Sequence, residues 1–106
     1  YKDDTRRRIP AQQLSNYSGT IIDFNHDGYA DIILSAVKTP PFEAAQVQAL
    51  QNDGKGVFTN VTGKVIPGIT VGRGWGIAVG DVNGDAVPDL MIGGWGSQVR
   101  LLLGKK

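Results

Sequence analysis

Two acidic loops of the same form constrain this chain more than any other feature. The segments Asp23–Asp31 and Asp81–Asp89 both follow the pattern Asp-x-Asn-x-Asp-x-x-x-Asp, and they start 58 residues apart in a chain of 106. Three carboxylates within nine residues repel one another unless a cation lies between them. Oxygen side chains at positions 1, 3 and 5, with a backbone carbonyl at position 7, suit the flexible coordination shell of Ca²⁺. The pattern therefore predicts a repeated calcium-binding module.

The spacing of these loops argues against an EF-hand. An EF-hand needs a bidentate Glu at position 12 and a helix on each side of the loop. Position 12 is Leu34 in the first loop and Ile92 in the second, and the last acid comes at position 9. The flanking segments, such as Thr20–Ile22, are short and β-branched. This composition favours strands on both sides of each loop.

A metal-free turn is the alternative explanation of the same residues. Asp, Asn and Gly also crowd hairpin loops because their side chains or backbones favour tight turns. The repetition in one register favours the metal site. The second loop departs from the first at position 6, where Ala86 replaces Gly28. If this position needs a positive φ, Ala86 costs about 1 kcal/mol. We therefore expect the second site to be the weaker one.

Composition limits the other classes of function. A chain of 106 residues with 41% hydrophobic residues has room for one small domain. The net charge of +1 supplies no strong field for nucleic acid, and no apolar run approaches the ~20 residues of a membrane helix. The chain has no cysteine, which leaves no disulfide or thiol chemistry to predict. We expect neither a nucleic-acid partner nor a membrane span.

The pattern of short apolar segments predicts an all-β fold. In the first repeat, strands are expected at 20–22, 32–37, 47–51 and 57–62, with Asn52–Gly56 forming a hairpin turn. Four antiparallel strands in about 45 residues match one blade of a β-propeller. The second repeat offers strands at 76–79, 90–92 and 99–103 and stops where its hairpin turn should begin. We therefore predict about two four-stranded antiparallel blades, the second lacking its fourth strand.

This organisation divides the chain into three segments. Residues 1–18 are polar and irregular, and form an N-terminal arm or the end of a preceding blade. Residues 19–66 form the first repeat with its calcium loop, and residues 67–106 form the second, truncated repeat with its own loop. Such a pair of blades leaves unpaired edges and half a core exposed, which natural proteins avoid. We expect the segment to be part of a larger propeller, completed by blades from the same polypeptide, from another chain or from copies of itself.

Three stretches carry a resemblance to a known family: residues 23–34, 50–62 and 80–94. Together they resemble the FG-GAP or VCBS-type repeats of calcium-binding β-propellers, such as those in integrin α-subunit heads. The resemblance implies a Ca²⁺ ion between the first two strands of each blade. It also implies two sets of ligands: Asp23, Asn25, Asp27, the Tyr29 carbonyl and Asp31; then Asp81, Asn83, Asp85, the Val87 carbonyl and Asp89. The chain departs from the family at Ala86 and at Ser35–Ala36, which replaces a glycine-rich stretch.

These features lead us to expect an extracellular scaffold that binds a protein or glycan ligand. The alternative is an accessory part of a secreted carbohydrate-active enzyme, or a lectin-like propeller in which Trp75, Trp95 and Tyr29 stack on sugars. The chain offers one histidine, His26, and we expect no complete active site within it. Loops of this kind bind Ca²⁺ at roughly 10⁻⁴ to 10⁻³ M, a level found outside the cytosol. We therefore expect an extracellular, periplasmic or cell-surface location.

Overall fold

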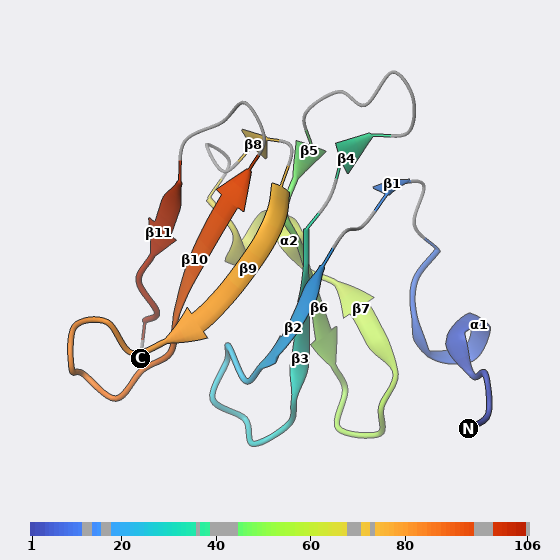
Figure 1. Cartoon of the computed structure of the whole chain (residues 1–106). Coiled ribbons are helices and arrows are strands. Elements are labelled where there is room, and N and C mark those ends of the chain that lie inside the picture. The colour runs from blue at the N-terminus through green and yellow to red at the C-terminus, as the bar shows by residue number, and fades with distance from the viewer. Residues whose placement is uncertain are drawn as a thin grey trace.

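The first repeat forms a four-stranded antiparallel sheet. The structure is a computed structural model that describes residues 1–11, 14–15, 18–35, 37–38, 45–67, 71–72, 74–94 and 99–105. The strands of this sheet are β2 (Gly19–Ile22), β3 (Asp31–Leu34), β6 (Gln48–Asn52) and β7 (Phe58–Asn60). They lie side by side in the order β2-β3-β6-β7, each antiparallel to the next (Figure 1). The predicted blade is confirmed.

The second repeat forms a three-stranded antiparallel sheet within the described residues. Its strands are β9 (Gly74–Gly80), β10 (Asp89–Gly94) and β11 (Arg100–Leu102), with β10 in the middle. A register shift interrupts the β9–β10 ladder between Gly93 and Gly94. The sheet has the first three strands of a blade and, in the described part of the chain, no fourth strand, as predicted. No helix in the described part of the chain has the length and hydropathy needed to cross a membrane.

Two pairs of two-residue strands extend the blades at the end away from the acidic loops. Strand β1 (Leu14–Ser15) pairs with β4 (Val37–Lys38), and β5 (Ala45–Gln46) pairs with β8 (Val71–Gly72). The sequence predicted one strand over 32–37, but β3 ends at Leu34 and β4 turns to a different partner. Ser35 lies at this break, where its backbone N–H and hydroxyl both donate to the Ser18 carbonyl. This bond continues the β2–β3 pairing by one residue, and Val37 then pairs with Ser15 of β1.

Two short helices, α1 (Thr5–Arg8) and α2 (Thr62–Val65), have the same local structure. Each begins after a residue with φ near −120° and ψ near 21°, and each is followed by Ile-Pro. The backbone N–H of that isoleucine, Ile9 or Ile66, donates to the carbonyl of the first helical threonine. The sequence predicted a strand through residue 62, but β7 ends at Asn60. The Asn60 side chain accepts from the Thr62 N–H and hydroxyl, which starts a helical turn instead of extending the ladder.

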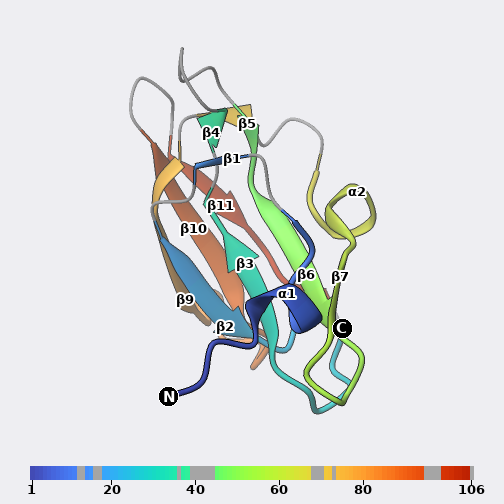
Figure 2. The ribbon, with the colours of Figure 1, turned by 90° about the vertical axis from the view of Figure 1, so that its right-hand side faces the viewer.

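The core lies between the two sheets, which pack face to face (Figure 2). Alternate residues point to opposite faces of a strand, so Ile33 and Ala49 of the first sheet face Leu90 and Ile92 of the second. Ile33 and Ala49 are fully buried. Helix α2 packs against β6 and adds Ile66 to this core. Burial of each large aliphatic side chain stabilises the fold by about 1.5–3 kcal/mol, which holds the two blades together and brings both acidic loops to one end of the molecule (Figure 1).

Candidate metal centres

The first acidic loop folds around the carboxylate of Asp23. The backbone N–H of Asp27 donates to Asp23 Oδ1 at 3.1 Å, and the N–H of Gly28 donates to Asp23 Oδ2 at 2.9 Å. Asp27 in turn accepts the N–H of Tyr29 at 2.9 Å, and its other oxygen accepts Asn25 Nδ2 at 3.1 Å. Aspartate side chains fold turns in this way by bonding to backbone a few residues on. The loop is therefore closed around its own acids.

The second loop repeats most of this arrangement. Asp81 Oδ1 accepts the N–H groups of Gly84 at 2.8 Å and Asp85 at 3.2 Å, and Asp81 Oδ2 accepts the N–H of Ala86 at 2.8 Å. Asp85 Oδ1 accepts the N–H of Val87 at 2.9 Å. The bonds of Asp85, Ala86 and Val87 join the same loop positions as those of Asp27, Gly28 and Tyr29, and the bond of Gly84 is additional. The equal spacing of Asp and Asn in the two sequences has thus produced two equivalent backbone turns.

The acid at position 9 of each loop is buried. Asp31 is 0% exposed and Asp89 is 1% exposed. Asp31 Oδ2 accepts the N–H of Phe24 at 3.2 Å, and Asp31 Oδ1 accepts the N–H of Asn52 at 2.8 Å. Asp89 makes the matching pair of bonds, to Val82 at 2.9 Å and to Gly104 at 2.8 Å. Each buried aspartate therefore fastens the start of its loop to the end of the third strand of its blade.

The three acids of each loop converge on one point. Oxygen atoms of Asp23, Asp27 and Asp31 lie within 4.8 Å of one another, and those of Asp81, Asp85 and Asp89 do the same. Convergent carboxylate oxygens are the donors that Ca²⁺ prefers. Asn25 reaches the first cluster through its bond to Asp27. The ligand roles of all ten residues, including Asn83 and the carbonyls of Tyr29 and Val87, stay predictions.

The pKa values of the acids follow from their surroundings. Partial burial raises the pKa of Asp23, but N–H donors from Gly28 and Asp27 outweigh it and leave that pKa below its ordinary value. The N–H of Ala86 is the main cause that lowers the pKa of Asp81. Burial raises the pKa of Asp31, and the charges of Asp27 and Asp23 add to that rise against the N–H donors of Asn52 and Phe24. A cation in the first cluster would relieve this repulsion.

Each loop has two positions with positive φ. At position 6, Gly28 has φ 88° and Ala86 has φ 66°, so the suspected strain at Ala86 is present. At position 4, His26 has φ 59° and Gly84 has φ 79°. Sequence reasoning overlooked position 4, although the glycine there in the second loop was the available signal. Each loop thus has one glycine and one side-chain-bearing residue at its two left-handed positions.

Comparison with known families decides the classification. The model of the FG-GAP-like repeat matches residues 23–92, which contain both acidic loops and most of both sheets. The chain belongs to the FG-GAP-like repeat family. Neither the curated proteins nor the solved structures compared with it gave a match. The family assignment agrees with the four- and three-stranded sheets of this FG-GAP segment.

Proposed function

We propose that this chain is a calcium-stabilised segment of a β-propeller that serves as an extracellular binding scaffold. The main support for the proposal is that three carboxylates converge in each of the two acidic loops, at the same corner of each blade, where its first strand turns into its second. In each corner a buried aspartate joins the loop to the third strand. A Ca²⁺ ion bound there would neutralise the acids and stiffen the blade at three of its strands. Sites of this kind fill at extracellular calcium levels, which supports a location outside the cytosol.

An exposed apolar face supports completion by further blades. Met91 and Leu101 pair across β10 and β11 on the face opposite the core, and they are 50% and 52% exposed. Val99 and Leu103, which share this face by alternation, are 66% and 55% exposed. A neighbouring blade would cover these side chains as the first sheet covers Leu90 and Ile92. The α1 turn, which matches α2 in sequence and geometry, supports the view that residues 1–18 end a preceding repeat.

The calcium part of the proposal predicts a stabilisation that depends on Asp27 and Asp85. With dissociation constants of roughly 10⁻⁴ to 10⁻³ M, 10 mM Ca²⁺ adds about 1.5–3 kcal/mol per site to the free energy of unfolding. Asp27→Ala should remove the share of the first site, and Asp85→Ala that of the second. The measurement is thermal unfolding with 10 mM CaCl₂ and with EDTA, with Asp53→Ala, an acid outside both loops, as the control. An unchanged calcium-dependent shift in both loop variants would overturn the proposal.

A second candidate function is sugar binding, and Tyr29 is the residue that favours it. Its ring packs against Gly54, since a Cβ at Gly54 would lie 3.1 Å from ring atoms, and the side chain is 49% exposed. An aromatic ring that packs against a glycine and remains half exposed suits a sugar face. Trp95 and the side chain of Trp75 lie outside what the structure describes. Binding of soluble oligosaccharides that Tyr29→Ala abolishes would support this function, and binding unaffected by Tyr29→Ala would remove its basis.

A further inference from the structure

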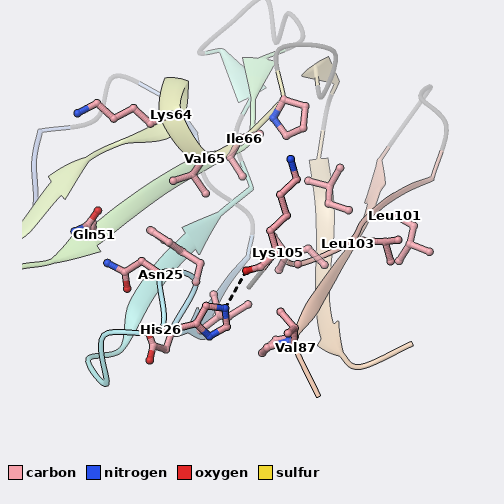
Figure 3. A pocket seen from close by; sticks show the side chains of 18 residues that line it. Asn25, His26, Gln51, Lys64, Val65, Ile66, Val87, Leu101, Leu103 and Lys105 are labelled. Carbon is pink, nitrogen blue, oxygen red and sulfur yellow. Dashed lines mark hydrogen bonds between the residues drawn. The ribbon is translucent and has the colours of Figure 1, made fainter. Parts of the chain in front are cut away.

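One side chain of the first loop reaches the second blade. A cavity of ≈ 500 Å³ lies between the two blades at their loop end, and residues of both loops, of α2 and of the segment after β11 line it (Figure 3). His26 lies at this cavity, and its Nε2 is 3.0 Å from the carbonyl oxygen of Lys105. A carbonyl oxygen can only accept, so Nε2 carries the proton in this hydrogen bond.

The contact continues from Lys105 into the second metal cluster. Lys105 follows Gly104, whose N–H donates to Asp89 Oδ1 at 2.8 Å. Gly104 also packs closely against the second loop, because a Cβ there would collide with the carbonyl oxygen of Pro88 and with Val87 Cγ1. Because Lys105 directly follows Gly104, a movement of the Lys105 carbonyl would act on the donor that holds Asp89. Within the described residues, His26, Lys105, Gly104 and Asp89 form a contact path from one loop to the other.

The other end of this path depends on closure of the first loop. His26 lies between Asn25 and Asp27, and the N–H of Asp27 donates to Asp23. His26 itself has φ 59°, a conformation that side-chain-bearing residues seldom adopt without external support. A closed loop fixes the backbone after His26 and so fixes the direction of the imidazole. An open loop would let His26 leave this conformation and release Lys105.

We propose that His26 couples the two calcium sites, so that occupation of the first tightens the second. The inference rests on the proposed function, because it requires that both loops bind calcium. His26 acts as a positioning residue and not as a ligand: its imidazole orients the segment that donates to Asp89. Coupling of this kind is reciprocal, so calcium in the second loop tightens the first by the same factor. A factor of about 5 or more is the expected size.

The second loop has no equivalent of this bridge. Its position 4 is Gly84, which lacks a side chain to reach beyond its own blade. The coupling therefore depends on one imidazole. Replacement of His26 by glycine removes that imidazole and suits the positive φ, so the first loop keeps its fold. His26→Gly therefore tests the contact path without disturbing the first loop.

The experiment is a calcium titration followed by NMR on the whole chain. The amide resonance of Gly28 reports the first site, and that of Gly84 reports the second. Four proteins are compared: the unsubstituted chain, Asp27→Ala, His26→Gly, and the double variant. Loss of the first site through Asp27→Ala should weaken calcium binding at Gly84 about 5-fold or more when His26 is present. The same loss should change it less than 2-fold when position 26 is glycine.

The outcomes separate this inference from the proposed function. If Asp27→Ala weakens the second site equally with His26 and with Gly at position 26, coupling does not pass through the imidazole and the inference is wrong. If Asp27→Ala leaves the second site unchanged, the sites are independent: the inference is again wrong, and the proposed function stands. If neither amide of the unsubstituted chain responds to calcium, the proposed function itself fails and the coupling with it. His26→Asn, which tolerates positive φ but is too short to reach Lys105, should reproduce the result of His26→Gly.

Discussion

The two acidic loops share the hydrogen bonds donated by the N–H groups at positions 5, 6 and 7, but they distribute their backbone strain differently. In the first loop the side chain at a left-handed position belongs to His26, and in the second it belongs to Ala86. Histidine is enriched in this conformation, whereas alanine is not. His26 also bonds to Lys105, whereas the side chain of Ala86 is a methyl group that can form no hydrogen bond. Equal sequence motifs therefore do not imply equal sites. The first loop has a side-chain-bearing residue with positive φ that forms a hydrogen bond to the second blade, whereas in the second loop that residue is an alanine, whose side chain can form none.

The two blades also differ where their third strands end. In the first blade Asn52 begins a turn, and its side chain accepts the N–H groups of Gly54 and Gly56. Strand β7 then returns alongside β6. In the second blade Gly104 occupies the place of Asn52: it bonds to its own buried aspartate but has no side chain to build a turn. The first blade is anchored on both sides of its third strand. The second is anchored, within the described residues, on one side.

The largest expected effect concerns the buried aspartates. Asp31→Ala removes the acceptor of two partly buried N–H groups, and each such bond contributes about 1.5–3 kcal/mol when the acceptor is charged. Relief of the burial that raises the Asp31 pKa offsets part of this, so a net loss of about 3 kcal/mol is expected. Asp89→Ala should cost about 1 kcal/mol less, since it frees only an edge strand. Urea unfolding in EDTA measures both, and equal losses would show that the two corners contribute alike.

Gly104 provides the next test of the difference between the blades. A Cβ there meets Pro88 and Val87, so Gly104→Ala should destabilise the chain by about 2 kcal/mol through overpacking. The control is Gly63→Ala. Gly63 lies in α2, and a Cβ there meets nothing within 4 Å. Alanine favours a helix over glycine, so this control should stabilise slightly. Thermal unfolding distinguishes the two. A tolerated Gly104→Ala would mean that the contact with the second loop is loose.

The strain at position 6 can be exchanged between the loops. Gly28→Ala should destabilise the chain by about 1 kcal/mol, because φ 88° disfavours any side chain even in open space. Ala86→Gly should stabilise the chain by up to about 1 kcal/mol and raise calcium affinity at the second site. The greater freedom of glycine in the unfolded chain reduces this gain in stability. Chemical denaturation and a calcium titration check the pair. The same sign for both changes would contradict the assignment of strain.

The smallest effect concerns the support of the first blade by α1. Arg8 donates to Asp4 at 2.6 Å and to the carbonyls of Lys55 and Gly56 in the β6–β7 turn. Arg8 and Arg7 hold the pKa of Asp4 below its ordinary value of 3.8. The bond therefore contributes fully above pH 3.8 and is lost as the pH falls through the lower pKa of the folded state. In EDTA, hydrogen exchange of the Gly56 amide should become faster as the pH falls through this lower pKa. Asp4→Asn should show the faster exchange already at pH 5, and insensitivity to both changes would remove this support.

Local patterns predicted most of the fold and the outline of the site. Alternating apolar residues and the Asn52–Gly56 turn gave the order of seven strands, because both signals are set by nearby residues. The acids converge as predicted, since each Asp bonds to backbone within its own loop. The end of β7 was missed because the Asn60 side chain bonds to Thr62, and the end of β3 was missed because Val37 pairs with Ser15 of another strand. The His26–Lys105 contact joins residues 79 apart and depends on how two sheets pack, which no local pattern contains.

The burial of the three acids in the first loop is graded, from buried Asp31 through half-buried Asp23 to exposed Asp27. An ion arriving from solvent would meet Asp27 first and would exchange its water molecules for protein oxygens one at a time. Departure would reverse this order, with Asp27 as the last group to let go. In the proposed calcium site, Asp27 would therefore be both the first carboxylate to meet the ion and the last to release it.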